Sequence, residues 1–158
     1  MKRKRKQKRM IPEVPVKSDL EAICDKLWKH LVRDEWGYVC AMCNTRTDLE
    51  CHHLISRRHE STRYVVKNGI LLCKNHHQLD PAVAPHENKA GFMLWLIDHH
   101  PERHEWMHDH AITPRFVGTK NWLYYCDVIR NFRQYFDDDS EYEKIVGIKF
   151  TAWLFQEG

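Results

Sequence analysis

Two pairs of potential metal ligands with identical spacing frame the middle of the chain. Two residues separate Cys40 from Cys43, and two separate Cys73 from His76. This spacing lets a tight turn direct both side chains of a pair at one ion, and two such pairs complete the tetrahedron that Zn²⁺ prefers. A site with four protein ligands is coordinatively closed, and its free energy of metal binding stabilises the fold. We therefore expect a structural zinc site that clamps the two ends of residues 40–76.

Two alternatives to this assignment stay open. The four residues could be buried independently of one another, although their matched spacing argues against that reading. His77 directly follows His76 and could replace it as the fourth ligand.

The six cysteines are interpreted as thiols or metal ligands rather than as disulfides. The sequence has no run of roughly 18 apolar residues that could span a membrane, and its N-terminus lacks the apolar core of a secretory signal. Both observations favour a cytoplasmic protein without a membrane partner, and in the cytoplasm thiols stay reduced.

A basic tail, residues 1–17, begins the chain. Residues 2–9, KRKRKQKR, carry seven positive charges, whereas the rest of the chain has 18 basic and 22 acidic residues. A run of like charges repels itself and is expected to be disordered. It could neutralise phosphates without reading sequence, or it could serve as a solubilising or targeting tail.

Three further segments follow the tail. Ser18 and Glu21 form a capping-box pattern ahead of apolar residues at helical spacing, which predicts an N-terminal helix within residues 18–36. Residues 37–88 are rich in Cys and His and show almost no helical period. Residues 89–158 show helical spacing again, with helices predicted over 88–100 and from Pro101 to about His110.

The last of these segments, residues 89–158, is predicted to be a helical accessory region. Apolar residues alternate with other residues between Val146 and Leu154, which predicts a terminal strand. Acidic residues outnumber basic ones over this region. We therefore expect its aromatic residues to pack against the middle segment or to bind a protein partner.

A histidine doublet, His52 and His53, lies in residues 49–55, which read as a short strand. Successive side chains of a strand point to opposite faces, so the two imidazoles cannot have the same role. One can bind a second metal ion. The other can accept a proton from water, because the pKa of histidine lies near neutral pH.

Further polar residues follow the doublet in a fixed order. Asn68 and Gly69 precede the apolar run Ile70-Leu71-Leu72, which ends at the second ligand pair and His77. Asn-Gly before an apolar run is also a plain turn signal. The order of these residues along the chain therefore indicates a metal-dependent catalytic site more strongly than any one of them does alone.

The stretch CAMC…ECHHLISRRH…STRY…NGILLCKNHH, within about residues 36–88, resembles the HNH endonucleases in the zinc-stabilised form common in phage and bacterial genomes. The resemblance implies an α+β fold, with a small ββα-metal zinc-stabilised nuclease module (37–88) flanked by N-terminal and C-terminal helices. It also implies metal-dependent hydrolysis of phosphodiester bonds in DNA, with double-stranded DNA as the expected substrate. The expected setting is DNA processing in the cytoplasm of a bacterium or a phage-infected host cell.

The resemblance also assigns roles to individual residues. His53 is implied as the general base, and Asn68 as the residue that holds its ring in orientation. His77 is implied as a ligand of the catalytic divalent ion together with His52. Mg²⁺ is the expected cellular ion, although imidazole ligands also suit Mn²⁺, Ni²⁺ or Zn²⁺. The implied structural zinc ligands are the four residues of the two spaced pairs: Cys40, Cys43, Cys73 and His76.

The chain departs from the family pattern after His77. Many relatives place another metal-ligating histidine four residues later, where this chain has Pro81. His86 could reach back to the ion, Asp80 could replace the missing ligand, or water could fill the position.

Three arginines, Arg57, Arg58 and Arg63, lie between the doublet and Asn68. Forked guanidinium groups suit phosphate binding, so we predict that these three contact DNA. A solvated loop is the alternative.

A different class of function also fits the ligand pairs. A non-catalytic zinc-binding adaptor for nucleic acid or protein would need the zinc ligands but not His53, Asn68 or His77. The presence of all three favours the nuclease. A toxin-like or restriction nuclease would share its chemistry and differ in target.

Overall fold

The structure is a computed structural model that describes residues 15–111 and 120–155. Of these, residues 24–111 belong to one compact unit, and residues 15–23 with 120–155 belong to the other. Both consist mainly of helices, and the first also contains a two-stranded antiparallel sheet, so the described fold is a small α+β fold. Of the basic tail, residues 1–14 lie outside the described residues. Across the described ranges, no helix is long and apolar enough to cross a membrane.

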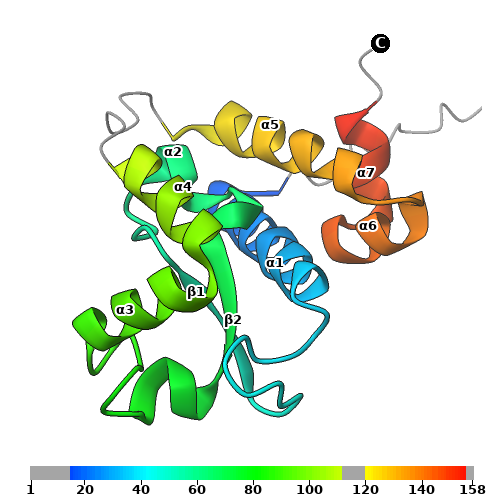
Figure 1. The fold of residues 1–158 in the computed structure, drawn as a ribbon. Helices are drawn as coiled ribbons and strands as arrows, with labels where there is room; N and C mark the ends of the chain where they lie inside the picture. Colours follow the sequence, from blue (N-terminus) through cyan, green and yellow to red (C-terminus); the bar gives the residue numbers. More distant parts are fainter. Residues whose placement is uncertain (1–14, 112–119, 156–158) are drawn as a thin grey trace, which may run out of the picture. The chain divides into compact units, whose positions relative to one another are not determined.

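The sheet pairs β1 (Leu49–His53) with β2 (Gly69–Cys73), in a register that sets Leu49 opposite Cys73 and His53 opposite Gly69 (Figure 1). Every residue of β2 is buried, whereas β1 is half-buried throughout. The connection between the strands contains α2 (Glu60–Arg63) and a 3₁₀ turn, Val66–Asn68.

Helix α1 (Lys17–Glu35) confirms the predicted N-terminal helix, although it begins before Ser18, which therefore lies inside its first turn. A Cβ atom on Gly69 would lie 2.2 Å from Cγ2 of Val32 and 3.0 Å from Cζ2 of Trp28. Gly69 has φ −105° and ψ 142°, which is ordinary extended backbone. The glycine is therefore needed for the close approach of α1 to β2, and Asn68-Gly69 is not a hairpin turn.

After β2 the chain forms a five-residue π-helical turn, Asn75–Leu79, and then α3 (Lys89–His99) and α4 (Pro101–Ala111). Both helices match their predicted positions, and the Asn88 side chain caps α3 by accepting a hydrogen bond from the Gly91 N–H at 2.8 Å. Helix α3 packs on the sheet (Figure 1). The buried cluster that joins them contains Cys40, Ile70, Leu72, Cys73, Phe92 and Leu96.

The other unit contains α5 (Trp122–Phe132), a 3₁₀ turn Arg133–Tyr135, α6 (Asp139–Val146) and α7 (Ile148–Leu154). The predicted terminal strand is wrong, because α7 occupies its place. Val146, Phe150 and Leu154 are buried, but Ile148 is 67% exposed. Residues four apart satisfy a helical period as well as an alternating one, so alternation alone misled the prediction.

Candidate functional site

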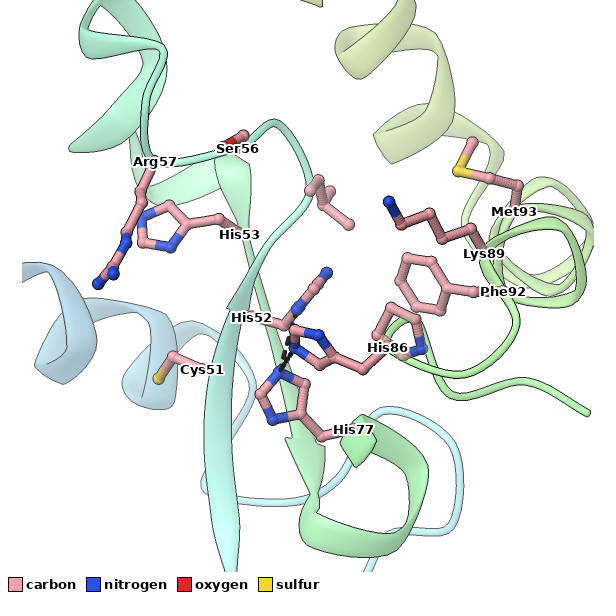
Figure 2. Close-up of a pocket in the computed structure, with 12 residues that line it drawn as sticks. Cys51, His52, His53, Ser56, Arg57, His77, His86, Lys89, Phe92 and Met93 are labelled. Atoms are coloured by element: carbon pink, nitrogen blue, oxygen red, sulfur yellow. Dashed lines mark hydrogen bonds between the residues drawn. The ribbon is translucent and has the colours of Figure 1, made fainter. Parts of the chain in front are cut away.

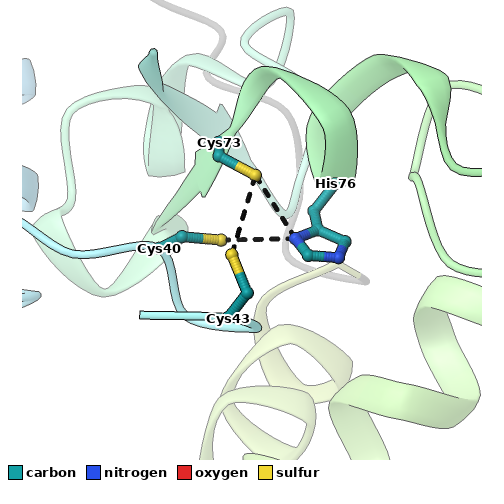
Figure 3. A group of neighbouring side chains, drawn as sticks. All are labelled: Cys40, Cys43, Cys73 and His76. Atoms are coloured by element: carbon teal, nitrogen blue, oxygen red, sulfur yellow. Dashed lines mark hydrogen bonds between the residues drawn. The ribbon is translucent and has the colours of Figure 1, made fainter. Parts of the chain in front are cut away.

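The two spaced ligand pairs come together in one cluster (Figure 3). Nδ1 of His76 lies 3.6 Å from Sγ of Cys40 and 3.3 Å from Sγ of Cys73, and the Sγ atoms of Cys43 and Cys73 are 3.9 Å apart. A tetrahedral zinc ion with bonds of about 2.0 to 2.3 Å places its ligand atoms roughly 3.3 to 3.8 Å apart. The Cys₃His cluster therefore has the spacing to bind a metal ion such as zinc.

The electrostatic surroundings favour thiolate at Cys40 of this cluster, whereas burial and the neighbouring Cys40 raise the pKa of Cys73. Burial raises the pKa of Cys40, but hydrogen bonds from the backbone of Cys73, Met42 and Cys43 and from His76 outweigh it and bring the pKa to about 7. Because thiolate is the metal-binding form of cysteine, a lowered pKa favours a bound cation. Nε2 of His76, on the far side of its ring, lies 3.9 Å from Oδ2 of Asp80. Asp80 is thus placed beside the Cys₃His cluster.

A second cluster consists of three histidines, from β1, from the turn at residues 75–79 and from the loop before α3: His52, His77 and His86. Nε2 of His77 lies 3.0 Å from Nδ1 of His52 and 3.1 Å from Nε2 of His86. All three ligand atoms lie within 4.8 Å of one another, and Figure 2 shows the rings converging on one point. Of the three alternatives for the ligand after His77, the structure brings His86 to the cluster.

Burial keeps His52 of the second cluster uncharged. Burial, with smaller contributions from the neighbouring His77, His86 and His53, lowers the pKa of His52 to about 3. An imidazole must be neutral to bind a metal ion, so His52 has its lone pair available at neutral pH. Three ligands on one side leave further coordination positions open for water or substrate.

Glu50 contributes to this cluster, and the sequence prediction missed it. Its Oε2 atom lies 2.5 Å from Nδ1 of His77 and accepts a second hydrogen bond from Nε2 of Gln78 at 2.7 Å. The contact with His77 lowers the pKa of Glu50. A carboxylate on the far ring nitrogen fixes the orientation of a metal-ligating histidine. Its position in the sequence could have indicated this role, because Glu50 and His52 are two residues apart on one strand and therefore face the same side.

His53 lies on the opposite side of β1 from His52, which confirms the alternation expected of the strand (Figure 2). Its ring stacks on Trp28 of α1, with centroids 3.8 Å apart and an angle of 7° between the planes. Nε2 lies 3.0 Å from the carbonyl oxygen of Arg63. A carbonyl only accepts, so Nε2–H is the donor and the lone pair of the neutral ring is on Nδ1.

The pKa of His53 is lowered to about 4, chiefly by burial. The hydrogen bond to Arg63 and the charge of Asp25 oppose this effect without reversing it. His53 is therefore neutral at pH 7, and its Nδ1 can accept a proton. Trp28 and the Arg63 carbonyl, neither of which was predicted, hold the ring in place from two directions.

Asn68 is fully buried, but it does not hold the ring of His53 directly. Its Oδ1 accepts from the Ile55 N–H at 2.7 Å, and its Nδ2 donates to the carbonyls of Ile55 and Thr62 at 3.0 Å each. These bonds join the two ends of the loop that supplies the Arg63 carbonyl. Asn68 is thus hydrogen-bonded within the loop that supplies the Arg63 carbonyl, and its predicted role in orienting His53 would act through that loop.

The three predicted phosphate-binding arginines differ in their surroundings. Arg57 and Arg58 are exposed, and Arg57 lines the pocket beside His53 (Figure 2). Arg63 is only 7% exposed, and its guanidinium lies 3.1 Å from Asp25 and 3.7 Å from Glu60. These ion pairs make Arg63 part of the folded loop, so it is removed from the phosphate-binding set.

One pocket of about 570 Å³ is lined both by His53 and by the three-histidine cluster. The cluster of His52, His77 and His86 lines it together with His53 and Arg57, although His52 and His53 leave the strand on opposite faces. Lys89 and Phe92 of α3 line it from the other side. A molecule in this pocket could therefore contact His53 and the three-histidine cluster simultaneously.

Comparison with known proteins adds no constraint on this site. No family model, curated protein or solved structure matches the chain. The chemistry of the clusters and the pocket is therefore the basis for assigning a function.

Proposed function

We propose that the chain is a metal-dependent endonuclease of the HNH type that hydrolyses phosphodiester bonds of double-stranded DNA. In this proposal β1, β2 and the helical turn at residues 75–79 form a ββα-metal module. The observation that carries the proposal is the single pocket lined by both His53 and the three-histidine cluster. DNA processing in a bacterium or a phage-infected cell is the proposed setting.

The catalytic divalent ion would be held by His52, His77 and His86. The distances between their ligand atoms are short enough for all three to bind one ion. Such an ion, when bound, stabilises negative charge on the phosphate and the leaving oxygen. Mg²⁺ is the abundant cellular candidate, but it favours oxygen ligands, whereas imidazole suits Mn²⁺, Ni²⁺ and Zn²⁺ better. Activity assays should therefore cover all four ions.

His53 would act as the general base. Its Nδ1 accepts a proton from a water molecule while the water oxygen attacks phosphorus and the bond from phosphorus to the leaving oxygen breaks. The stacked Trp28 ring and the Arg63 carbonyl hold the His53 imidazole in one orientation, so the ring needs little reorientation before the proton moves. Correct placement of a reacting group contributes several kcal/mol to catalysis.

Asn68 would support the base as a positioning residue, and Arg57 and Arg58 would contact phosphates from the exposed loop. The Cys₃His cluster would hold a structural zinc ion. Its four protein ligands leave no position for substrate, so its role is to fix the ends of the segment that carries both histidine groups.

A plasmid-nicking assay tests this proposal. The full chain should nick supercoiled plasmid with at least one of Mg²⁺, Mn²⁺, Ni²⁺ or Zn²⁺. His53→Ala should lower the rate at least about 100-fold, in line with the loss of a general base. His108→Ala is the matched control, because His108 is an exposed histidine of α4, and it should nick normally.

Two outcomes would contradict the proposal. Equal nicking by the starting protein and by His53→Ala would exclude His53 as the base. No nicking with any ion, by a folded protein that retains zinc, would favour the non-catalytic adaptor.

A further inference from the structure

Three basic residues form a stripe along α1. Lys26, Lys29 and Arg33 are three and four residues apart, so their side chains share one helix face. The two lysines are exposed and Arg33 is half-buried. Among the ion pairs recorded within residues 15–111 and 120–155, none involves any of the three. We call these residues the α1 basic stripe.

The acidic residues of the same helix segment do not neutralise this stripe. Asp25 pairs with Arg63, and Glu35 pairs with Arg103 at 2.6 Å, so both carboxylates are engaged with residues from other elements. Asp34 is exposed, but it directly follows Arg33, and adjacent residues of a helix do not face each other. The stripe is therefore a local concentration of positive charge on a chain whose remainder, outside the N-terminal tail, is acidic.

The stripe lies next to the pocket. The thiol of Cys51, which lines the pocket, donates to the Lys29 carbonyl with Sγ and O 3.6 Å apart. Arg57 lines the pocket on this side as well, beside His53 (Figure 2).

We infer that the α1 basic stripe, together with Arg57, binds the backbone phosphates of duplex DNA and leads one strand to the pocket. The inference rests on the proposed nuclease function, which makes DNA the substrate of that pocket. From Lys26 to Arg33 the helix rises about 10 Å. One DNA strand carries a phosphate about every 3.4 Å along the duplex axis, so the stripe spans roughly three phosphates.

This mode of binding has a consequence for specificity. Contacts to phosphate fix the position of a protein on the duplex but carry no base information. The stripe should therefore bind duplexes of different sequence equally, and its contribution should depend strongly on salt, because each contact releases counterions.

The salt dependence of duplex binding tests the inference. The full-length chain carrying His53→Ala, which prevents cleavage, is titrated against a fluorescent 30-base-pair duplex between 50 and 200 mM KCl. Lys26→Gln, Lys29→Gln and Arg33→Gln, combined on that background, should reduce the slope of log affinity against log salt by about 2 to 3. Circular dichroism establishes that each protein is folded.

A matched control removes the same net charge from other exposed lysines. Lys67→Gln, Lys144→Gln and Lys149→Gln, also combined, should change the slope by less than about 1. The basic tail is present in every protein, so its contribution cancels. With His53 intact, the stripe variant should have a raised KM and a kcat within about twofold of the starting protein, since it alters binding rather than chemistry.

The outcomes separate this inference from the nuclease proposal. Equal slopes for the stripe and control variants, or no duplex binding by the starting protein, would overturn the role of the stripe. A reduced slope for the stripe variant, together with no nicking by the His53-intact protein with any of the four metal ions, would support the stripe and contradict the nuclease proposal.

Discussion

His76 and His77 are neighbours on one helical turn, yet they belong to two clusters of different chemistry. His76 completes a set of three thiols, whereas His77 is the centre of three imidazoles. Soft thiolates select ions such as zinc, and four ligands close the coordination shell. Three imidazoles leave positions open for water and substrate. Two adjacent residues of one turn thus separate a site that can hold the fold from a site that can perform chemistry.

Each histidine also has its own carboxylate at the ring nitrogen that faces away from its cluster. Asp80 lies 3.9 Å from Nε2 of His76, and Glu50 lies 2.5 Å from Nδ1 of His77. We call the Cys₃His cluster the closed cluster and the group of His52, His77 and His86 the open cluster. The closer of the two carboxylate contacts, that of Glu50, belongs to the open cluster. A site with fewer ligands depends more on the orientation of each one, and we interpret the tight contact of Glu50 in that way.

Disrupting the closed cluster should have the largest effect. Cys40→Ser should lose zinc and unfold, because structural zinc contributes about 10 to 16 kcal/mol in small metal domains and whole proteins are stable by only about 5 to 15 kcal/mol. Circular dichroism and metal analysis measure both changes. Cys51→Ser, outside the cluster, should stay folded and retain zinc. A folded Cys40→Ser protein with its full zinc content would refute the structural role.

Substituting the adjacent histidines separately should divide the two roles. His77→Ala should keep the zinc content and the fold but lower nicking at least about 100-fold, because it removes the central ligand of the open cluster. His76→Ala should instead lower the zinc content and the melting temperature. Identical behaviour of the two variants in melting and metal analysis would mean that the clusters are one functional unit.

Glu50→Ala should have an intermediate effect on the open cluster alone. Loss of the carboxylate that orients His77 should weaken the activating ion about 10- to 100-fold. The concentration of Mn²⁺ that gives half-maximal nicking measures this change, and kcat at saturating Mn²⁺ should recover. A lower kcat without any shift in metal requirement would instead place Glu50 in the chemical step.

Asp80→Asn should have the smallest effect, confined to the closed cluster. Asp80 is separated from His76 by 3.9 Å, so its contribution to zinc affinity should be at most about tenfold. Competition with a zinc chelator measures that affinity. A change in the Mn²⁺ requirement for nicking, with zinc affinity unaltered, would contradict this assignment and would show that Asp80 acts on the three-histidine cluster.

The sequence predicted the features that depend on local spacing. The two CxxC-like pairs fixed the closed cluster, and strand alternation correctly divided His52 from His53. The same reasoning failed for residues 146–154, where positions four apart fit both a strand and a helix. Local spacing therefore identifies metal ligands well. It does not distinguish a helix from a strand where the same apolar positions fit both periods.

The remaining features depend on tertiary contacts that spacing does not encode. The loop that carries His86 lies so close to α3 that a Cβ atom on Gly91 would lie only 1.9 Å from the Ala82 carbonyl oxygen. The Asn88 side chain also donates to the Pro81 carbonyl at 3.2 Å. Trp28 meets His53 only after α1 packs on the sheet. The burial of Arg63 likewise required a partner, Asp25, that lies 38 residues away in the sequence.

Selective removal of one metal tests the division between the clusters most directly. The full chain is dialysed against a weak chelator, and zinc content and plasmid nicking are measured before and after Mn²⁺ is added. We predict that about one zinc ion per chain is retained, that nicking is lost, and that Mn²⁺ restores it in the starting protein but not in His77→Ala. Loss of nicking only when zinc is also lost, without recovery on addition of Mn²⁺, would contradict the assignment of separate structural and catalytic metals.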